Sequence, residues 1–115
     1  MKSENHLVKA KRLYETQKSL DTDKDWETII EDLFGASLHY TAYICERKIG
    51  MHMDTHKGLI KFLRANDMSE LSVLFSALDV CRIGTWYGSK GNGNVVKEAR
   101  KIIDKFKEKA GELHE

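Results

Sequence analysis

Arg82 is the side chain in this 115-residue sequence whose position most invites a chemical role. Leu71, Phe75 and Leu78 recur at spacings of four and three, which places them on one stripe of a helix. Arg82 continues that stripe, and a guanidinium on an apolar stripe is unfavourable unless a partner or a ligand meets it. Asp79, three residues earlier, is a candidate partner.

Two interpretations of this arginine stay open. In the structural one, Arg82 extends to solvent or pairs with Asp79. In the functional one, the stripe continues to Trp86, and Arg82 faces a groove together with the aromatic pair Trp86 and Tyr87.

A second candidate is a basic stripe upstream of that helix. Lys57, Lys61 and Arg64 follow one another at spacings of four and three, so they share one outer helix face. Such a stripe could hold phosphate groups, and the binding would then depend on salt. The alternative is an ordinary solvated surface face.

An arginine and a histidine also occur close together at Arg47 and His52. An arginine that stabilises developing phosphate charge, with a histidine as general acid or base, could cleave RNA by attack of the 2′-hydroxyl. In the alternative interpretation, Arg47 interacts with a helix C-terminus and His52 is solvated.

We expect no metal site and no cofactor. His52 and His56 are four residues apart with Asp54 between them and Cys45 upstream, but no third ligand stands at a characteristic spacing. Cys45 and Cys81 show no C-x-x-C spacing, and we expect both to be free thiols in a reducing cytosol.

The composition is that of a globular domain, with 41% hydrophobic and 32% charged residues and a net charge of +1. No global field therefore favours nucleic acid or a membrane. The charge is instead distributed locally, because residues 21–46 are strongly acidic and the segments on either side are basic. No apolar run approaches the length of a signal peptide or a membrane span, so we expect a soluble cytoplasmic protein with one domain, residues 1–115.

Helical periodicity runs through nearly the whole chain, and strand-like alternation is absent. We expect long helices over about residues 3–20, 23–48, 69–88 and 95–113, and a short one between the loop 51–54 and residues 66–67. Candidate N-caps are Ser3, the segment 21–23, Asp54 or Thr55, and Ser69, and Gly50 suits a helix C-terminus. The predicted fold is all-α, an up-and-down bundle of four long helices plus one short helix.

Small residues interrupt the second predicted helix at Gly35, Ala36 and Ser37. Residues of this size let helix axes approach closely. We therefore expect another helix to cross the second helix at this point.

Three stretches of the sequence together resemble the HEPN family (higher eukaryotes and prokaryotes nucleotide-binding domain) in its small prokaryotic stand-alone form. They are GASLHYTAYICERKIG at residues 35–50, THKGLIKFLR at 55–64 and LFSALDVCRIGTWYG at 74–88. The resemblance extends over about residues 5 to 108. It implies a helical bundle that forms a homodimer with a groove at or near the interface.

Many members of that family are encoded beside a small nucleotidyltransferase and act as toxin–antitoxin or nucleotide-linked modules. Its catalytic members are metal-independent ribonucleases with an arginine and a histidine four to six residues apart. Arg82 stands at the matching place here, but Trp86 and Tyr87 occupy the positions where the histidine would follow. In some relatives a tyrosine just after the motif accepts a nucleotide, and Tyr87 is the residue here that matches it.

The resemblance implies a homodimeric module that binds nucleotide or RNA phosphates, or pairs with a nucleotidyltransferase, without catalysis. Arg82 would face the phosphate with Asp79 beside it, Trp86 would be available for stacking, and Tyr87 would belong to the same nucleotide-binding site. Lys57, Lys61 and Arg64 would form a peripheral basic edge. The alternatives are a metal-independent endoribonuclease and a purely structural interaction protein whose groove is filled by a partner helix.

Overall fold

The computed structural model describes residues 2–51, 57–86 and 93–114, except for the side chains of residues 84–86 and 93. These residues form five helices and no strand, which confirms the all-α class. The helices are α1 (Ser3–Lys18), α2 (Trp26–Ile49), α3 (Leu59–Ala65), α4 (Ser69–Trp86) and α5 (Gly93–Leu113).

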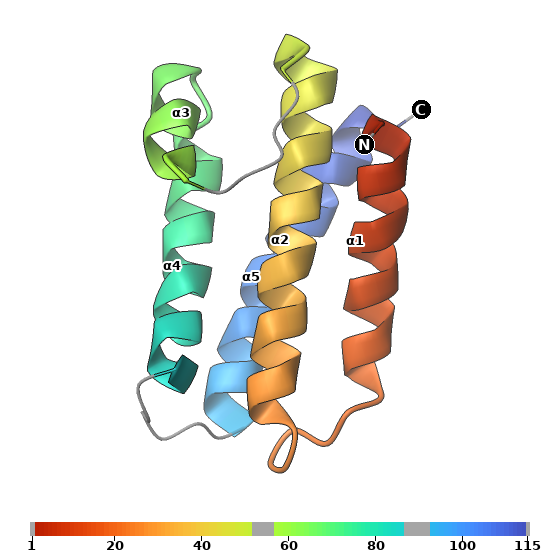
Figure 1. Cartoon of the computed structure of the whole chain (residues 1–115), viewed down its shortest axis with the longest axis vertical. Coiled ribbons are helices and arrows are strands. Elements are labelled where there is room, and N and C mark those ends of the chain that lie inside the picture. The colour runs from red at the N-terminus through yellow and green to blue at the C-terminus, as the bar shows by residue number, and fades with distance from the viewer. Residues whose placement is uncertain (1, 52–56, 87–92, 115) are drawn as a thin grey trace.

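The longest helix, α2, stands in the middle of the molecule (Figure 1). It packs against α1 on one side, α4 on the other and α5 behind, and α4 also contacts α5. The short α3 packs on α4. Because α2 touches three other helices, most of its circumference must be apolar.

The sequence of α2 meets that requirement. Its buried residues are Ile29, Ile30, Leu33, Phe34, Ala36, Ser37, Tyr40, Thr41, Ala42, Tyr43, Ile44 and Cys45. A Cβ placed on Gly35 would lie 3.2 Å from Leu13 Cδ1 of α1. The close approach predicted from the small residues of α2 is therefore confirmed, and the helix that approaches is α1.

Three polar contacts attach α1 to α5. The hydroxyl of Tyr14 donates to Asp104 Oδ1 at 2.6 Å, and this bond to a carboxylate raises the pKa of Tyr14 to about 12. Arg100 donates from Nε to Gln17 Oε1 at 2.8 Å and from Nη2 to the Gln17 carbonyl at 3.1 Å. Since Gln17 is buried, these bonds favour one relative position of the two helices.

The turn before α2 uses its aspartates differently from our expectation. Asp21 Oδ1 accepts hydrogen bonds from the backbone N–H groups of Asp23 and Lys24, both at 2.8 Å, and these bonds lower its pKa. Asp25 is the residue before the helix and makes no side-chain capping bond. The prediction that residues 21–23 cap α2 is wrong, because Asp21 stabilises the turn itself.

Two serines predicted as caps lie inside their helices. Ser3 is the first residue of α1, behind Lys2, which makes no side-chain cap. Ser69 is likewise the first residue of α4. Gly50 ends α2 in the left-handed conformation, with φ of 68°, as its position predicts.

The third helix starts later than expected. Asp54 and Thr55, the predicted caps, lie outside the described residues. Gly58 precedes the helix with φ of 73°, and α3 begins at Leu59. A residue in this left-handed conformation cannot continue a right-handed helix, so it separates α3 from the residues before it.

Over the described residues, no helix has both the length and the apolar character needed to cross a membrane.

Leu33 tests whether α2 is the centre of the core. Its side chain is fully buried in α2, so Leu33→Ala should lower the free energy of unfolding by about 2–5 kcal/mol. Val8→Ala serves as the control, because Val8 is 65% exposed on α1 and its truncation should change stability by less than about 0.5 kcal/mol. Urea denaturation measures both, and equal losses would contradict this core assignment.

Candidate functional site

Arg82 lies on the buried side of α4 and pairs with Asp79 of the same chain. Its Nε and Nη2 atoms both lie 3.1 Å from Asp79 Oδ1. The guanidinium carbon is 4.2 Å from the centroid of the Phe34 ring on α2. The Arg82 side chain is 21% exposed. The apolar stripe of α4 therefore ends in a largely buried guanidinium that pairs with Asp79 and lies over the ring of Phe34.

The local sequence explains this position. Phe75, Leu78 and Arg82 share the face of α4 that packs on α2, and the first two are buried. The rings of Phe34 and Phe75 are 5.4 Å apart. A planar guanidinium can lie over an aromatic ring while its edge bonds to a carboxylate, which a lysine cannot do equally well.

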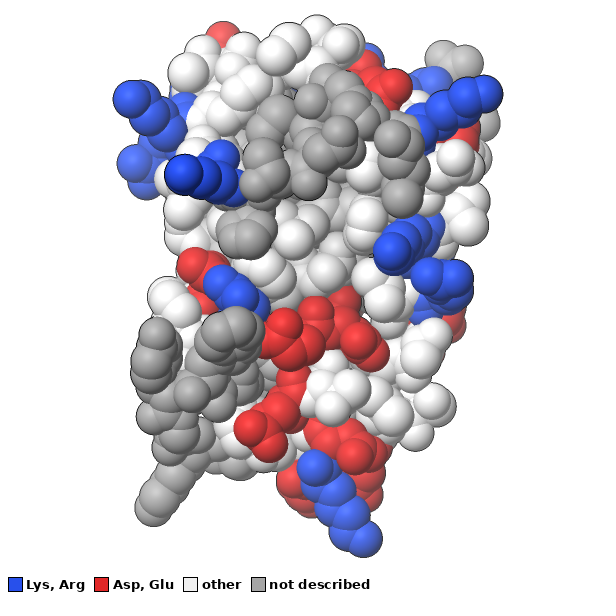
Figure 2. Space-filling view, viewed as in Figure 1, with Lys and Arg blue, Asp and Glu red and all other residues white. Residues whose placement is uncertain are grey.

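A hollow of about 580 Å³ lies between α3 and α4, next to this ion pair. Its lining residues are Gly58, Leu59, Ile60, Lys61, Arg64, Phe75 and Asp79. Two of them, Lys61 and Arg64, are exposed cations from the predicted basic stripe. Figure 2 shows basic side chains bordering this face at the level of α3 and along α1, while acidic side chains gather over the lower half of α2.

Asp79 links the two predicted groups of residues. It lines the hollow with Lys61 and Arg64, and it also holds Arg82. The structure therefore brings two cations of the basic stripe and the arginine of α4 to one place. The prediction that Lys57 shares a helix face with these two cations is wrong, because α3 begins only at Leu59, after Gly58. Lys57 is exposed just before α3 and is not among the residues that line the hollow.

The aromatic candidates and the histidines of the sequence-based site are not tested by these contacts. Trp86 is the last residue of α4, and its side chain is not described. Tyr87 lies outside the described residues, as do His52 and His56 with Asp54 between them.

Arg47 interacts with a helix end, although not with its own. Its Nη2 donates to the carbonyl oxygen of Leu113 at 3.0 Å, at the last residue of α5. The guanidinium carbon lies 5.9 Å from the ring centroid of Tyr43. A cation at the C-terminus of α5 offsets the negative end of that helix dipole, so this arginine joins α2 to α5.

Neither thiol has the lowered pKa that is typical of a catalytic cysteine. Burial raises the pKa of Cys45 to about 11. Burial and, to a smaller extent, the charge of Glu98 raise the pKa of the half-buried Cys81. Both cysteines are free, and the described residues contain no group of three or more side chains suited to hold a metal ion.

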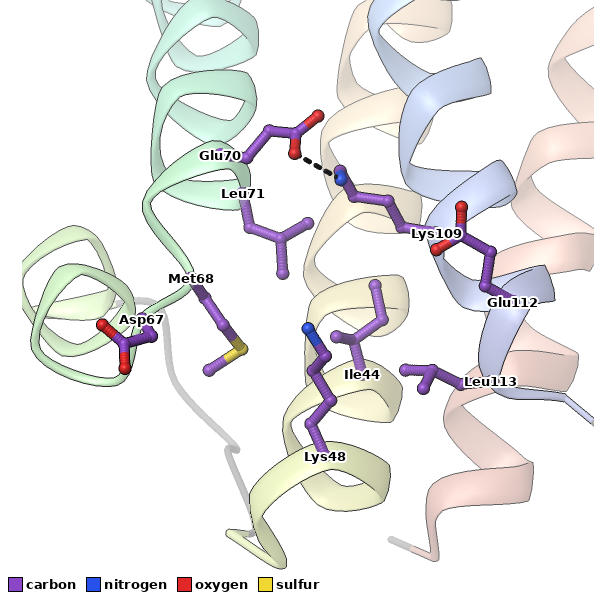
Figure 3. A pocket seen from close by; sticks show the side chains of 9 residues that line it. All are labelled: Ile44, Lys48, Asp67, Met68, Glu70, Leu71, Lys109, Glu112 and Leu113. Carbon is purple, nitrogen blue, oxygen red and sulfur yellow. Dashed lines mark ion pairs between the residues drawn. The ribbon is translucent and has the colours of Figure 1, made fainter.

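A second, smaller hollow of about 110 Å³ lies where α2, α4 and α5 meet (Figure 3). Lys109 of α5 reaches across it to Glu70 of α4 at 2.8 Å, and this contact is the main cause that lowers the pKa of Glu70. Its walls also include the apolar side chains of Ile44, Leu71 and Leu113. Its charges thus connect two helices, and we assign it a structural role.

The sequence-based search did not assign His6 and His39. Their Nδ1 atoms lie 2.8 Å apart between α1 and α2, and His6 is buried. One signal was present, since His6 stands four residues before Ala10 on the buried stripe of α1. The contact itself joins residues 33 positions apart, which periodicity does not reveal.

Comparison with known proteins assigns no family. No family model, no curated protein and no solved structure matches the chain. The HEPN resemblance consequently rests on the three stretches of sequence in which it was found.

A double-mutant cycle tests the contact between Arg82 and Asp79. Arg82→Ala should destabilise the fold by about 1–2 kcal/mol, because it removes both the ion pair and the stacking on Phe34. Asp79→Asn should cost less, and the coupling energy from urea denaturation should be about 0.5–1 kcal/mol. A coupling near zero would mean that the pair contributes nothing in solution.

Proposed function

We propose that this chain is a homodimeric helical module, an up-and-down bundle of HEPN type, that binds nucleotide or RNA phosphates between α3 and α4. The observation that carries the proposal is the hollow in which Lys61 and Arg64 stand next to the Asp79–Arg82 pair. Its setting is the cytoplasm, where nucleotides and RNA are present.

The charges of the hollow suit an anion. Lys61 and Arg64 are exposed, and neither has an ion-pair partner among the described residues. Cations of this kind bind phosphates by releasing condensed counterions, and Arg64 can also bind two phosphate oxygens at once. A phosphate placed between them would gain attraction without breaking an existing contact.

The rest of the lining suits the less polar part of a nucleotide. Leu59, Ile60 and Phe75 contribute apolar surface beside the two cations. The volume of about 580 Å³ lies within the range of about 300–1,000 Å³ that is usual for small-molecule sites. A base or a ribose can rest on this wall while its phosphate faces the charges.

Arg82 has a positioning role in this proposal. It contacts Asp79 and Phe34, and these contacts fix the position of Asp79 in the lining of the hollow. Arg82 is not among the residues that line the hollow, but it offsets the negative charge of Asp79, which would otherwise repel an anion there. Binding should therefore depend on Arg82 even though Lys61 and Arg64 make the contacts. We propose binding without cleavage, because Trp86 and Tyr87 follow Arg82 where a catalytic histidine would stand.

The outer face of α4 supports the homodimer. Val73, Val80 and Ile83 are 63%, 69% and 47% exposed, and Ala77 lies between them. The charged residues between Val73 and Ile83 are Asp79 and Arg82, which pair with each other, and the Arg82 guanidinium lies over Phe34 of α2. An uncharged helix face of this length is typical of an interface. We assign it to a second copy of the chain, with a nucleotidyltransferase as the competing partner.

The binding site is tested by titrating the protein with ATP and with a short single-stranded RNA at low salt. Lys61→Ala combined with Arg64→Ala should weaken RNA binding about tenfold or more. The slope of log K against log salt should become shallower by about 1.4, since each phosphate contact on a single strand contributes about 0.7.

The matched control is Lys97→Ala combined with Lys101→Ala, which removes two exposed lysines from α5 instead. If both double variants weaken RNA binding equally, the loss comes from the lower net charge, and the hollow between α3 and α4 is not the binding site. Unchanged binding in Arg82→Ala would also count against it. RNA cleaved by the wild type in EDTA, and left intact by Arg82→Ala, would favour the endoribonuclease.

The dimer is tested with Val80→Asp, which places a carboxylate in the middle of the uncharged face of α4. We expect light scattering to show a dimer for the wild type and a monomer for the variant, with the same circular dichroism. Val8→Asp is the control, because Val8 is 65% exposed on α1. A wild type that is monomeric at about 100 µM, well above the dissociation constants of stable interfaces, would contradict the dimer.

A further inference from the structure

We propose that the face of α1 that carries Asn5, Lys9 and Arg12, on the helix whose His6 contacts His39 of α2, is a second anion site, where a phosphate-class anion binds Lys9 and Arg12 together with a proton taken up by the His6–His39 pair. It lies on different helices from the hollow between α3 and α4, so it does not depend on the function proposed above.

The geometry supplies a place for the anion. A hollow of about 300 Å³ runs along one stripe of α1, lined by Asn5, Val8, Lys9 and Arg12. Asn5, Lys9 and Arg12 follow at spacings of four and three, so the amide and the two cations stand on successive turns of one face. An amide donor and two cations match the oxygens of one tetrahedral anion.

The two cations have no carboxylate partner among the described residues. On α1 itself, Glu4 lies near His114 at 3.8 Å and Glu15 pairs with Lys18 at 3.4 Å. Lys9 and Arg12 therefore add positive charge to this face that nothing on their own helix neutralises.

Asp32, an acidic group of α2, does not neutralise it either. Asp32 and Glu46 stand seven residues before and after His39, on the same side of α2. The pKa of Asp32 is raised, first by burial and then by Glu31, whereas a lysine or arginine partner would lower it. The contact nearest to His39 comes from α1.

That contact is the histidine pair. The Nδ1 atoms of His6 and His39 lie 2.8 Å apart, with ring centroids 5.1 Å apart, so one ring donates its proton to the other. His6 is buried, while His39 is half-buried and is the ring that solvent reaches. If His39 donates through Nδ1–H, its Nε2 can take a proton from solvent and the bond between the rings survives.

Without a bound anion, the surroundings of His39 disfavour its protonated form. Burial lowers the pKa of His39 below its ordinary value of 6.5, and so do His6, Lys9 and Arg12. Among the described residues of α1, α4 and α5, the three helices that pack on α2, the charged groups that act on His39 are these three of α1. An anion beside Lys9 and Arg12 offsets their repulsion, so the protonated ring becomes more favourable.

The sign of the pH dependence follows. Without an anion, the lowered pKa of His39 gives stability that is fully present above pH 6.5 and is lost as the pH falls toward the folded-state pKa. With an anion, this loss is reduced. By linkage, the anion binds more tightly at low pH, where the pair carries the additional proton.

Sulfate is the probe, because it stays doubly charged between about pH 5.5 and 7.5 and so reports only protons taken up by the protein. Calorimetric titration of the whole chain should show binding about three- to tenfold tighter at about pH 5.5 than at about pH 7.5. Histidine NMR signals should move on addition of sulfate at the lower pH. Inorganic phosphate should bind at the same residues.

Lys9→Ala combined with Arg12→Ala should weaken sulfate binding about tenfold or more at both pH values. His39→Gln keeps an amide that can bond to His6, and it should retain the affinity near pH 7.5 while losing the gain at low pH. Lys97→Ala combined with Lys101→Ala should change neither.

Two results would overturn the inference. One is a wild-type affinity for sulfate that is the same at both pH values. The other is an affinity that the Lys9 and Arg12 substitutions leave unchanged. Neither depends on whether the histidine variant folds.

Discussion

The need to bury α2 on nearly all sides determines how the other helices are placed. Its twelve buried residues leave little of its surface for water, and apolar surface of this kind is stabilised only by contact with other apolar surface. α1, α4 and α5 supply that contact, each with an apolar stripe. α3 has no place on α2 and packs on α4, and the hollow between α3 and α4 results from this.

Polar contacts then select one arrangement among those that bury the same apolar area. Tyr14 and Gln17 of α1 bond to Asp104 and Arg100 of α5, and Arg47 of α2 bonds to the last carbonyl of α5. Such hydrogen bonds add little net stability, but leaving a partly buried one unmade, as at Tyr14 or Gln17, is costly. They therefore disfavour shifted packings of α5, which has the most amphipathic sequence of the four long helices.

Most of the fold could be predicted from the sequence, because apolar periodicity is local information. The stripes of Leu71, Phe75 and Leu78 on α4 and of Ile103 and Phe106 on α5 are buried as their spacing indicates. The caps were predicted less well, because the oxygen of Asp21 can bond either to its own turn or to the helix that follows, and the sequence does not say which.

The candidate site was predictable in its parts but not in its assembly. Spacing placed Arg82 on a buried stripe and the cations Lys61 and Arg64 on one face of another helix. Their convergence around Asp79 depends on how α3 folds back on α4, which spacing along one helix does not encode. The same limit hid the histidine pair, since His6 and His39 meet only because α1 and α2 are neighbours.

The two thiols of the chain differ in accessibility in a way that is useful for spectroscopy. Cys45 is fully enclosed in the core, whereas Cys81 is only half-buried and directly precedes Arg82. An alkylating reagent meets Cys81 first, because reaction at Cys45 requires the core to open. A fluorophore or spin label can thus be attached beside the arginine of α4 in the unmutated chain, without removing either cysteine.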